Sequence, residues 1–250
     1  ILKLFDAFGY SIVAKKKKYA DVAVELDDTD VELIKNVLDS GYTLTSVPRL
    51  VNTLKSCRYA VDNNISGDFV ECGVWRGGNG ILAKRIFQHL ASDKNVWMFD
   101  TFEGMTKPTN VDVAASSKVA AEGEFLKQQK ELHNEWCYAS LDDVKENCLN
   151  SGLNLESFTF VKGDVCETLK LLENIPNQIS VLRLDTDWYE STKIELETLY
   201  PRLSDRGVLI IDDYGHWEGA RKAVDEYFST KKYKPLFNVT DYTGRSAIKL

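Results

Sequence analysis

The chain has 250 residues, and its 38 aspartates and glutamates outnumber its 31 lysines and arginines, which gives a formal net charge of −7. This length suits one α/β domain with an extension, and the acidic balance gives no electrostatic support to a nucleic-acid partner. Five cysteines without a CxxC pair indicate reduced thiols, and no apolar run approaches the roughly 18 residues that span a bilayer. We therefore expect a cytoplasmic protein with no membrane anchor and no nucleic-acid partner. Because the chain begins with Ile1, we expect it to be a fragment of a longer chain.

From about residue 65 onward, strand-like and helix-like segments alternate. The first predicted elements are strand 68–75, helix 78–90, strand 96–102, helix 140–150, strand 158–164, short helix 166–173 and strand 179–185. A helix with Leu196, Leu199, Tyr200 and Leu203 on one face comes next, followed by a strand over 208–211. The last elements are a helix with Ala220, Ala223, Val224, Tyr227 and Phe228 on one face, and closing strands 235–241 and 246–250. This alternation predicts an α/β fold with a doubly wound, mostly parallel sheet of seven strands.

Two regions fall outside the alternation. Residues 1–64 are helical in character and predict an N-terminal extension that caps the sheet or packs on a partner subunit. Residues 103–139 form a long connection with little apolar periodicity, directly after the second predicted strand. Long connections in compact domains are often functional, so we expect this one to be a lid.

A glycine-containing turn follows the first predicted strand. Its residues are Glu71, Cys72, Gly73 and then Val74 to Gly78, with a Gly-x-x-x-Gly spacing. Dinucleotide-binding folds carry G-x-G-x-x-G instead, whose second glycine makes room for a pyrophosphate. The acidic Glu71 suits an ammonium group, so the motif favours a nucleoside that carries an amino acid. A plain strand-to-helix turn remains the structural alternative.

Aspartates also end the second and third predicted strands. Asp100 occupies the place where nucleotide folds usually bind ribose hydroxyls, and Gly163-Asp164 lies where an adenine amino group would be bound. Each aspartate alone is equally consistent with a helix cap or a turn. Together with the glycine turn they outline one nucleoside pocket.

Four carboxylates follow the next two predicted strands. Asp185 and Asp187 end one apolar run, and Asp212 and Asp213 end the other. Because parallel strands end at the same edge of a sheet, these side chains should gather there and repel one another unless a cation is bound. Oxygen ligands of this kind suit Mg²⁺ or another divalent cation. His216, just beyond, is a candidate for a polar contact to the substrate or a catalytic role.

A structural interpretation of the same aspartates stays open. Asp187 and Asp213 are placed to cap the helices that follow them, while the other two could pair with Arg183 or Lys193. Helix capping needs only one aspartate after each strand, whereas two successive strands here each end in a cluster of them. A metal site is therefore the favoured interpretation.

The motifs, taken together, resemble those of the macrocin O-methyltransferase (TylF/MycF-type) family. The matching segments are GDFVECGVWRGG at residues 67–78, FDTFEGM at 99–105, LDTDWYEST at 184–192 and IDDY at 211–214. The resemblance covers roughly residues 42–250. It implies a Rossmann-like domain of the class I methyltransferase type over residues 65–250, S-adenosylmethionine (SAM) as cofactor, Mg²⁺ or another divalent cation, and methylation of a hydroxyl on a sugar-containing metabolite. Family members tend to be oligomers, so we expect a homo-oligomer.

Carried over residue by residue, the resemblance assigns roles to the motif positions. Metal ligands would be Asp185, Asp212 and Asp213, and Asp185 would also be the general base. From its position beside Asp185, Asp187 is a second candidate for the general base. The residues expected to bind the cofactor are Glu71, Gly73, Val74, Trp75, Gly77, Asp100, Thr101, Phe102, Gly163, Asp164 and Asp185.

Three alternatives to this function remain at the level of the sequence. A metal-dependent methyltransferase acting on a catechol or another vicinal diol would share the acid cluster. A nicotinamide-dependent oxidoreductase is disfavoured by the missing G-x-G-x-x-G. A non-catalytic SAM-binding protein would have no reason to keep repelling carboxylates together.

Overall fold

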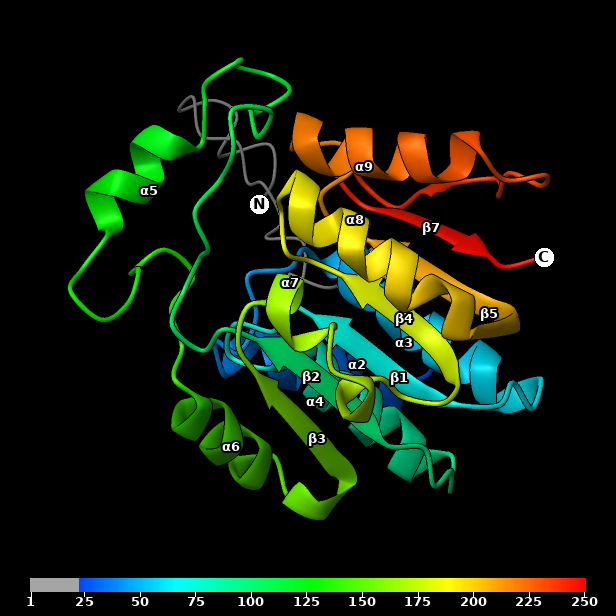
Figure 1. Cartoon of the computed structure of the whole chain (residues 1–250). Helices are drawn as coiled ribbons and strands as arrows, with labels where there is room; N and C mark the ends of the chain where they lie inside the picture. Colours follow the sequence, from blue (N-terminus) through cyan, green and yellow to red (C-terminus); the bar gives the residue numbers. More distant parts are fainter. Residues whose placement is uncertain (1–22) are drawn as a thin grey trace, which may run out of the picture.

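Seven strands form a single sheet in the computed structural model, which describes residues 23–250 (Figure 1). The strand order is β3-β2-β1-β4-β5-β7-β6. The parallel part comprises β1 Asp68–Cys72, β2 Val96–Asp100, β3 Phe158–Lys162, β4 Ile179–Leu184 and β5 Leu203–Ile211. At one edge, β7 Arg245–Ile248 runs antiparallel to β5, and β6 Asn238–Val239 runs antiparallel to β7. The predicted doubly wound, mostly parallel sheet is confirmed.

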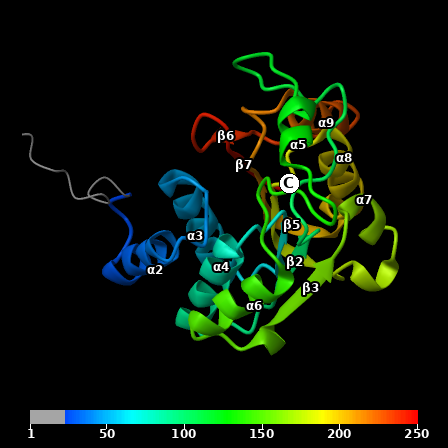
Figure 2. The same ribbon diagram turned by 90° about the vertical axis from the view of Figure 1, so that its left-hand side faces the viewer.

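Helices cover both faces of this sheet, as Figure 2 shows. Val70 and Leu182 point to one face, whereas Phe69 and Val181 point to the other, so the parallel strands are buried on both sides. One face packs on α3 Val47–Asp62, α4 Gly78–His89 and α6 Leu141–Asn150, and α2 Asp28–Asp39 packs on α3 and α4. The opposite face packs on α7 Val165–Thr168, α8 Tyr189–Thr198 and α9 Glu218–Ser229. The N-terminal helices α2 and α3 therefore belong to the layer that includes α4, and residues 1–22 of the predicted extension lie outside the described part of the chain.

Several predicted elements differ from the structure in their bounds. The short helix 166–173 is divided into α7 and a 3₁₀ turn, η2 Leu172–Asn174, with an extended Leu171 between them. The helix predicted to reach Leu203 ends at Thr198, because Pro201 has no backbone N–H to continue it and instead enters the 3₁₀ turn η3 Tyr200–Arg202. Leu203 is buried as the first residue of β5 rather than on a helix. The closing strands are also shorter than the predicted 235–241 and 246–250.

The long connection after β2 contains one short helix, α5 Glu122–Gln128, and two isolated β-bridges, and a third bridge joins its Ala114 to Trp217. A further 3₁₀ turn, η1 Leu155–Ser157, precedes β3. In Figure 1 the connection runs beside the start of α9, and α5 stands away from the sheet.

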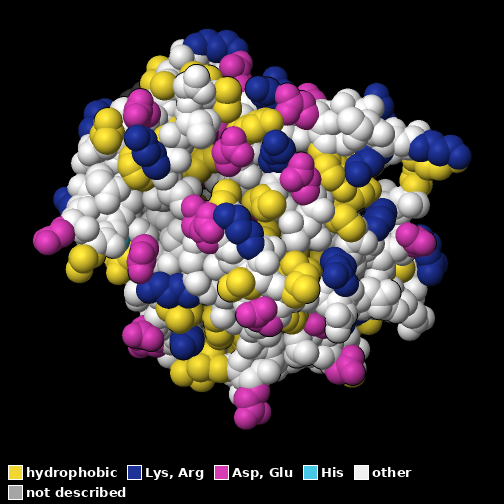
Figure 3. Space-filling model, viewed as in Figure 1, with side chains coloured by type: hydrophobic (Ala, Val, Ile, Leu, Met, Phe, Trp, Pro, Cys, Tyr) yellow, Lys and Arg dark blue, Asp and Glu magenta, His cyan; other side chains and the backbone are white. Residues whose placement is uncertain are grey.

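The surface carries charges of both signs. On the face seen in Figure 3, lysine and arginine side chains are interspersed with aspartates and glutamates rather than gathered into one large patch. None of the described helices is both long enough and apolar enough to cross a bilayer.

Candidate active site

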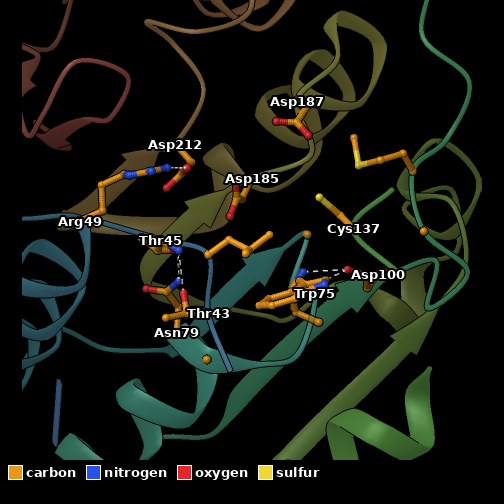
Figure 4. Close-up of a pocket in the computed structure, with 16 residues that line it drawn as sticks. Thr43, Thr45, Arg49, Trp75, Asn79, Asp100, Cys137, Asp185, Asp187 and Asp212 are labelled. Atoms are coloured by element: carbon orange, nitrogen blue, oxygen red, sulfur yellow. Dashed lines mark hydrogen bonds and ion pairs between the residues drawn. The ribbon is translucent and has the colours of Figure 1, made fainter. Parts of the chain in front are cut away.

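Two adjoining cavities lie at the carboxyl ends of β1, β2, β3 and β4. They share Gly73, Asp100, Gly104, Met105 and Asp185 as lining residues. The first cavity extends toward the N-terminal segment and the acidic residues, as Figure 4 shows. The second extends toward the end of β3 and the start of α8. This is the edge of an open α/β sheet where ligands bind.

The turn after β1 depends on Gly73. Its φ is +81°, and a Cβ at this position would lie 1.9 Å from the carbonyl oxygen of Asp185. The neighbouring strand ends are this close because the N–H of Asp185 donates to the carbonyl of Cys72 (2.8 Å). Gly77, with a φ of +85°, then leads into α4. A larger residue at Gly73 would push the ends of β1 and β4 apart.

Asp100 organises the turns around it. Its Oδ2 accepts hydrogen bonds from the backbone N–H groups of Val74 (2.7 Å) and Trp75 (3.2 Å), and its Oδ1 accepts one from the N–H of Phe102 (2.7 Å). Burial raises the pKa of this carboxyl, although these N–H donors oppose the shift. Asp100 lines both cavities, and Thr101 lines the second. Asp100 therefore holds the turns after β1 and β2 in place, and it is also positioned to contact a bound molecule.

Gly163 and Asp164 line the second cavity together with Thr186 and Ser191. Asp164 also caps α7, since its Oδ1 accepts a hydrogen bond from the N–H of Cys166 (2.8 Å). The capping interpretation and the pocket interpretation of Asp164 are thus both consistent with the geometry.

Glu71 lies beneath the cavities and is not among their lining residues. Its Oε1 accepts a hydrogen bond from Nη1 of Arg183 (2.8 Å), which stands beside it on β4, and its Oε2 has no partner. Burial raises the pKa of Glu71 to about 7. The Glu71 side chain is therefore directed at Arg183, and its contact with a ligand's ammonium group, direct or through water, stays a prediction. The sequence feature that indicates this ion pair is Arg183 itself, a charged residue within the apolar run of β4.

Three carboxylates form a compact cluster, of which Asp185 and Asp187 line the first cavity. One oxygen from each of Asp185, Asp187 and Asp213 lies within 4.8 Å of the others. Burial raises the pKa of all three, to about 7 for Asp187, and the repulsion among them acts in the same direction. A cluster of oxygen donors that resist ionisation in this way fits a hard divalent cation.

Asp212 lies next to this cluster but is held by two arginines. Arg183 Nη2 and Arg49 Nη1 each donate to one of its oxygens, and Figure 4 shows Arg49 reaching it from α3. Arg183 also pairs with Asp185 (2.6 Å), as the structural interpretation of the sequence allowed. The structure thus places Asp187 in the cluster with Asp185 and Asp213, where the family resemblance names Asp212.

His216 does not line either cavity. Its Nδ1 contacts the hydroxyl of Tyr242, and its backbone carbonyl accepts a hydrogen bond from the N–H of Ala115 (2.7 Å). Burial, and the nearby Arg49, lower the pKa of the imidazole. The residue lies beside the acidic region rather than in it.

The segment between α2 and α3, together with the first turn of α3, is part of the site, although no motif in the sequence indicates a function for it. Thr43, Thr45 and Arg49 line the first cavity. The segment is attached to the start of α4, because the carbonyl of Tyr42 accepts from the N–H of Gly78 (3.0 Å) and Asn79 Nδ2 donates to Thr45 Oγ1 (3.1 Å). The N-terminal extension therefore completes a wall of the cavity.

The long connection is fixed to the helices that follow the acidic motifs. Asp112 is fully buried, and its Oδ1 accepts a hydrogen bond from the N–H of Tyr189 at the start of α8 (2.8 Å). Trp136 of the connection packs edge-on against Trp188 and Trp217, with ring centroids 5.6 and 6.1 Å away. Cys137, next in sequence, lines the first cavity.

A family model described as macrocin O-methyltransferase (TylF) matches residues 5–246. The chain belongs to this family. Demethyldecarbamoylnovobiocin O-methyltransferase from Streptomyces niveus is 35% identical over 191 residues, which are 75% of this chain and 68% of that protein. Mycinamicin III 3''-O-methyltransferase from Micromonospora griseorubida is 31% identical over 207 residues, covering 80% and 78%. Among solved structures, the O-methyltransferase NovP superposes with a TM-score of 0.72 at 32% identity, covering 83% of this chain and 82% of that one.

Membership of the macrocin O-methyltransferase family confirms the resemblance inferred from the motifs. The family match begins at residue 5, which extends it well upstream of the residue 42 at which the sequence resemblance begins. The protein is accordingly an enzyme, a SAM-dependent O-methyltransferase, and the nicotinamide-dependent oxidoreductase is set aside.

Proposed function

We propose that this enzyme transfers the methyl group of SAM to a sugar hydroxyl of a glycosylated natural product, with the help of Mg²⁺ or another divalent cation. The observation that carries the proposal is the acid cluster at the wall of a cavity whose other wall is the glycine turn. The family relatives named above support the class of acceptor, since their names refer to novobiocin and mycinamicin precursors.

The two cavities suit the two ends of SAM. The methionine end would lie against Gly73, Val74 and Trp75, and the adenosine end would extend past Asp100 toward Asp164. Glu71 would act on the methionine end only indirectly, by holding Arg183. The remaining candidates for cofactor contacts are Gly77, Thr101, Phe102, Gly163 and Asp185.

The divalent cation would be held by carboxylates of this region, with Asp185 and Asp213 common to the observed cluster and to the set that the resemblance names, and its positive charge would offset the repulsion among them. When bound, such a cation lowers the pKa of an acceptor hydroxyl and orients neighbouring oxygens.

A carboxylate of this cluster would serve as the general base. Asp187 lines the cavity, so one of its oxygens could take the proton of an acceptor hydroxyl bound there. Asp185 lines the same cavity and is the other candidate. The hydroxyl proton would pass to the carboxylate as the acceptor oxygen forms its bond to the methyl carbon and the carbon–sulfur bond of SAM breaks.

The test combines binding and turnover. SAM is titrated calorimetrically into the protein, and methyl transfer is then assayed on a panel of glycosides and catechols, with Mg²⁺ or with EDTA. We expect SAM binding, and methylation of glycosides that EDTA abolishes. Methylation of catechols alone would replace the acceptor class, and EDTA-resistant turnover would remove the metal.

Asp213→Asn probes the cluster directly. We expect it to lower the rate of methyl transfer by about 10²-fold or more while SAM affinity is retained, because the side chain supports charge at the acceptor and not the cofactor. Asp205→Asn, an exposed carboxylate near the start of β5, is the matched control and should leave both quantities unchanged. Unchanged turnover in Asp213→Asn would contradict the role of the cluster.

We also propose that the enzyme is a homo-oligomer located in the cytoplasm. The family resemblance supports the first statement, and five free cysteines, three of them buried, support the second. Light scattering coupled to size-exclusion chromatography tests the oligomer, and a monomeric mass would contradict it.

A further inference from the structure

Asp212 is held from two sides by guanidinium groups of different mobility. Arg183 is fully buried and is fixed by Glu71 (2.8 Å) and Asp185 (2.6 Å) as well as by Asp212. Arg49 comes from the first turn of α3, its side chain is 19% exposed, and it lines the cavity. Of the two, only Arg49 has room to leave.

A second carboxylate is available to Arg49 if it leaves. Its Nε lies 3.1 Å from Oδ2 of Asp241, and it also donates to Oγ of Ser46 (3.2 Å). Asp241 is held in place by the backbone N–H groups of Thr243 (3.0 Å) and Gly244 (2.8 Å), both of which donate to its Oδ1. Arg49 therefore bridges Asp212 and an anchored alternative partner.

The balance of charge explains why Arg49 reaches inward. Five carboxylates gather at this place, namely Glu71, Asp185, Asp187, Asp212 and Asp213, against the two guanidinium groups of Arg49 and Arg183. Buried like charges are costly unless cations offset them, and Arg49 supplies such a cation. A divalent cation at the cluster would supply the same charge, and it would repel a guanidinium group placed beside it.

We propose that Arg49 is a displaceable internal counter-ion, and that its ion pair with Asp212 and the binding of a divalent cation exclude one another. Cation binding moves the Arg49 guanidinium toward Asp241, which frees Asp212 to join Asp185 and Asp213. The cluster of Asp185, Asp187 and Asp213 is then the arrangement without the cation, and the set with Asp212, which the family motif names, is the arrangement that holds it. This inference rests on the divalent cation of the proposed function.

The test is the affinity of the protein for Mn²⁺, measured without acceptor by electron paramagnetic resonance of the free ion. Arg49→Met removes the competing charge and should bind Mn²⁺ about tenfold more tightly, because a hydrogen bond between charged groups no longer has to be broken. Arg49→Gln, which keeps a donor for Ser46, should show the same direction if the methionine variant does not fold.

Lys55→Met is the matched control. It removes one positive charge from the same helix, but Lys55 pairs with Glu25 at an exposed position, so Mn²⁺ affinity should not change. Unchanged or weaker binding in the Arg49 variants, or an equal gain in Lys55→Met, would overturn the inference. If neither the wild type nor the Arg49 variants bind Mn²⁺, the divalent cation of the proposed function fails first, and the inference fails with it.

Discussion

At the scale of single residues, the close approach of β1 and β4 depends on the absence of a side chain at Gly73. We predict that Gly73→Ala lowers the free energy of unfolding by about 2–4 kcal/mol, because its Cβ would meet the Asp185 carbonyl at 1.9 Å in a left-handed backbone conformation. SAM affinity should fall as well, since the same turn lines both cavities.

Chemical denaturation and calorimetric titration of SAM measure the two effects. Gly123→Ala is the control, because nothing lies within 4 Å of a Cβ at that exposed position in α5. Native-like stability and SAM affinity in Gly73→Ala would show that the turn tolerates a wider spacing of the strands.

Glu195 is a buried carboxyl that the proposed chemistry does not use. Its Oε1 accepts a hydrogen bond from the hydroxyl of Thr186 (2.8 Å), its Oε2 has no partner, and burial raises its pKa to about 8. A glutamate in the unfolded chain has a pKa of about 4.3, so the folded state binds an extra proton between these two values. The contribution of Glu195 to the free energy of unfolding of the wild-type protein therefore falls as pH rises from about 4.3 to about 8, because the folded state must keep or lose that extra proton at a cost.

We predict that Glu195→Gln is more stable than the wild type by an amount that grows over this range of pH and then levels off. Thermal unfolding at pH 5, 7 and 9 measures it. Glu197→Gln, an exposed position on the same helix, should show no such trend. A difference that shrinks with rising pH would contradict the protonated state of Glu195.

At the scale of elements, Asp112 attaches the long segment between β2 and α6 to α8 through hydrogen bonds. The side chain supplies one oxygen to Tyr189 and the other to the backbone and hydroxyl of Thr109 (2.7 and 2.8 Å). It also contacts the start of α9, where a Cβ on Gly219 would lie 1.9 Å from its Oδ1. One buried carboxylate thus links the connection to both helices that follow the acidic motifs.

We predict that Asp112→Ala lowers the free energy of unfolding by about 2–4 kcal/mol and raises the KM for the acceptor more than the Kd for SAM, because buried N–H donors lose their acceptor near the acid cluster. Denaturation and steady-state kinetics measure these effects. Glu131→Ala removes an exposed carboxylate from the same connection and serves as the control. An equal loss of SAM affinity would show that Asp112 supports the whole site.

The elements that the sequence predicts best are those with continuous apolar runs. β1 to β5 and α4, α6 and α9 follow from such runs and from helical periodicity, which depend only on burial. The end of α8 was misplaced because Leu203 continues the helical spacing by coincidence, while Pro201 ends the helix. α5 is short and largely exposed, so it leaves almost no apolar pattern to detect.

The candidate site was predictable where its residues follow strands. The strand ends placed Gly73, Asp100, Asp164 and the acid cluster at one edge. Arg49 was not predictable in this way, because it reaches Asp212 across 163 positions of sequence through the packing of α3 on the sheet. Contacts of this kind depend on tertiary packing, which a single sequence does not display.

At the scale of the whole molecule, the divalent cation proposed for the acid cluster would couple the stability of the fold to the concentration of that cation. We predict that Mg²⁺ raises the Tm, since a ligand at about 100 times its Kd stabilises the folded state by about 2.7 kcal/mol. For a chain of this size that corresponds to roughly 5–10 °C. The effect should be larger at pH 8 than at pH 6, because protonation of carboxyls with raised pKa values competes with the cation.

Differential scanning calorimetry with Mg²⁺ and with EDTA at the two pH values measures this coupling. Asp213→Asn should lose most of the shift, whereas Asp205→Asn should keep it. A shift that is equal at both pH values would indicate that the cation binds elsewhere.

The anchoring of the long connection has a consequence for evolution. Asp112 and Trp136 fix it on either side of residues 126–133, whose Leu126 and Leu132 are 60% and 82% exposed. A segment held at both flanks, with little share in the core, can be exchanged between relatives without disturbing the cofactor turn or the acid cluster. We expect members of this family to differ in acceptor preference through changes in this segment, while the methyl-transfer reaction itself stays the same.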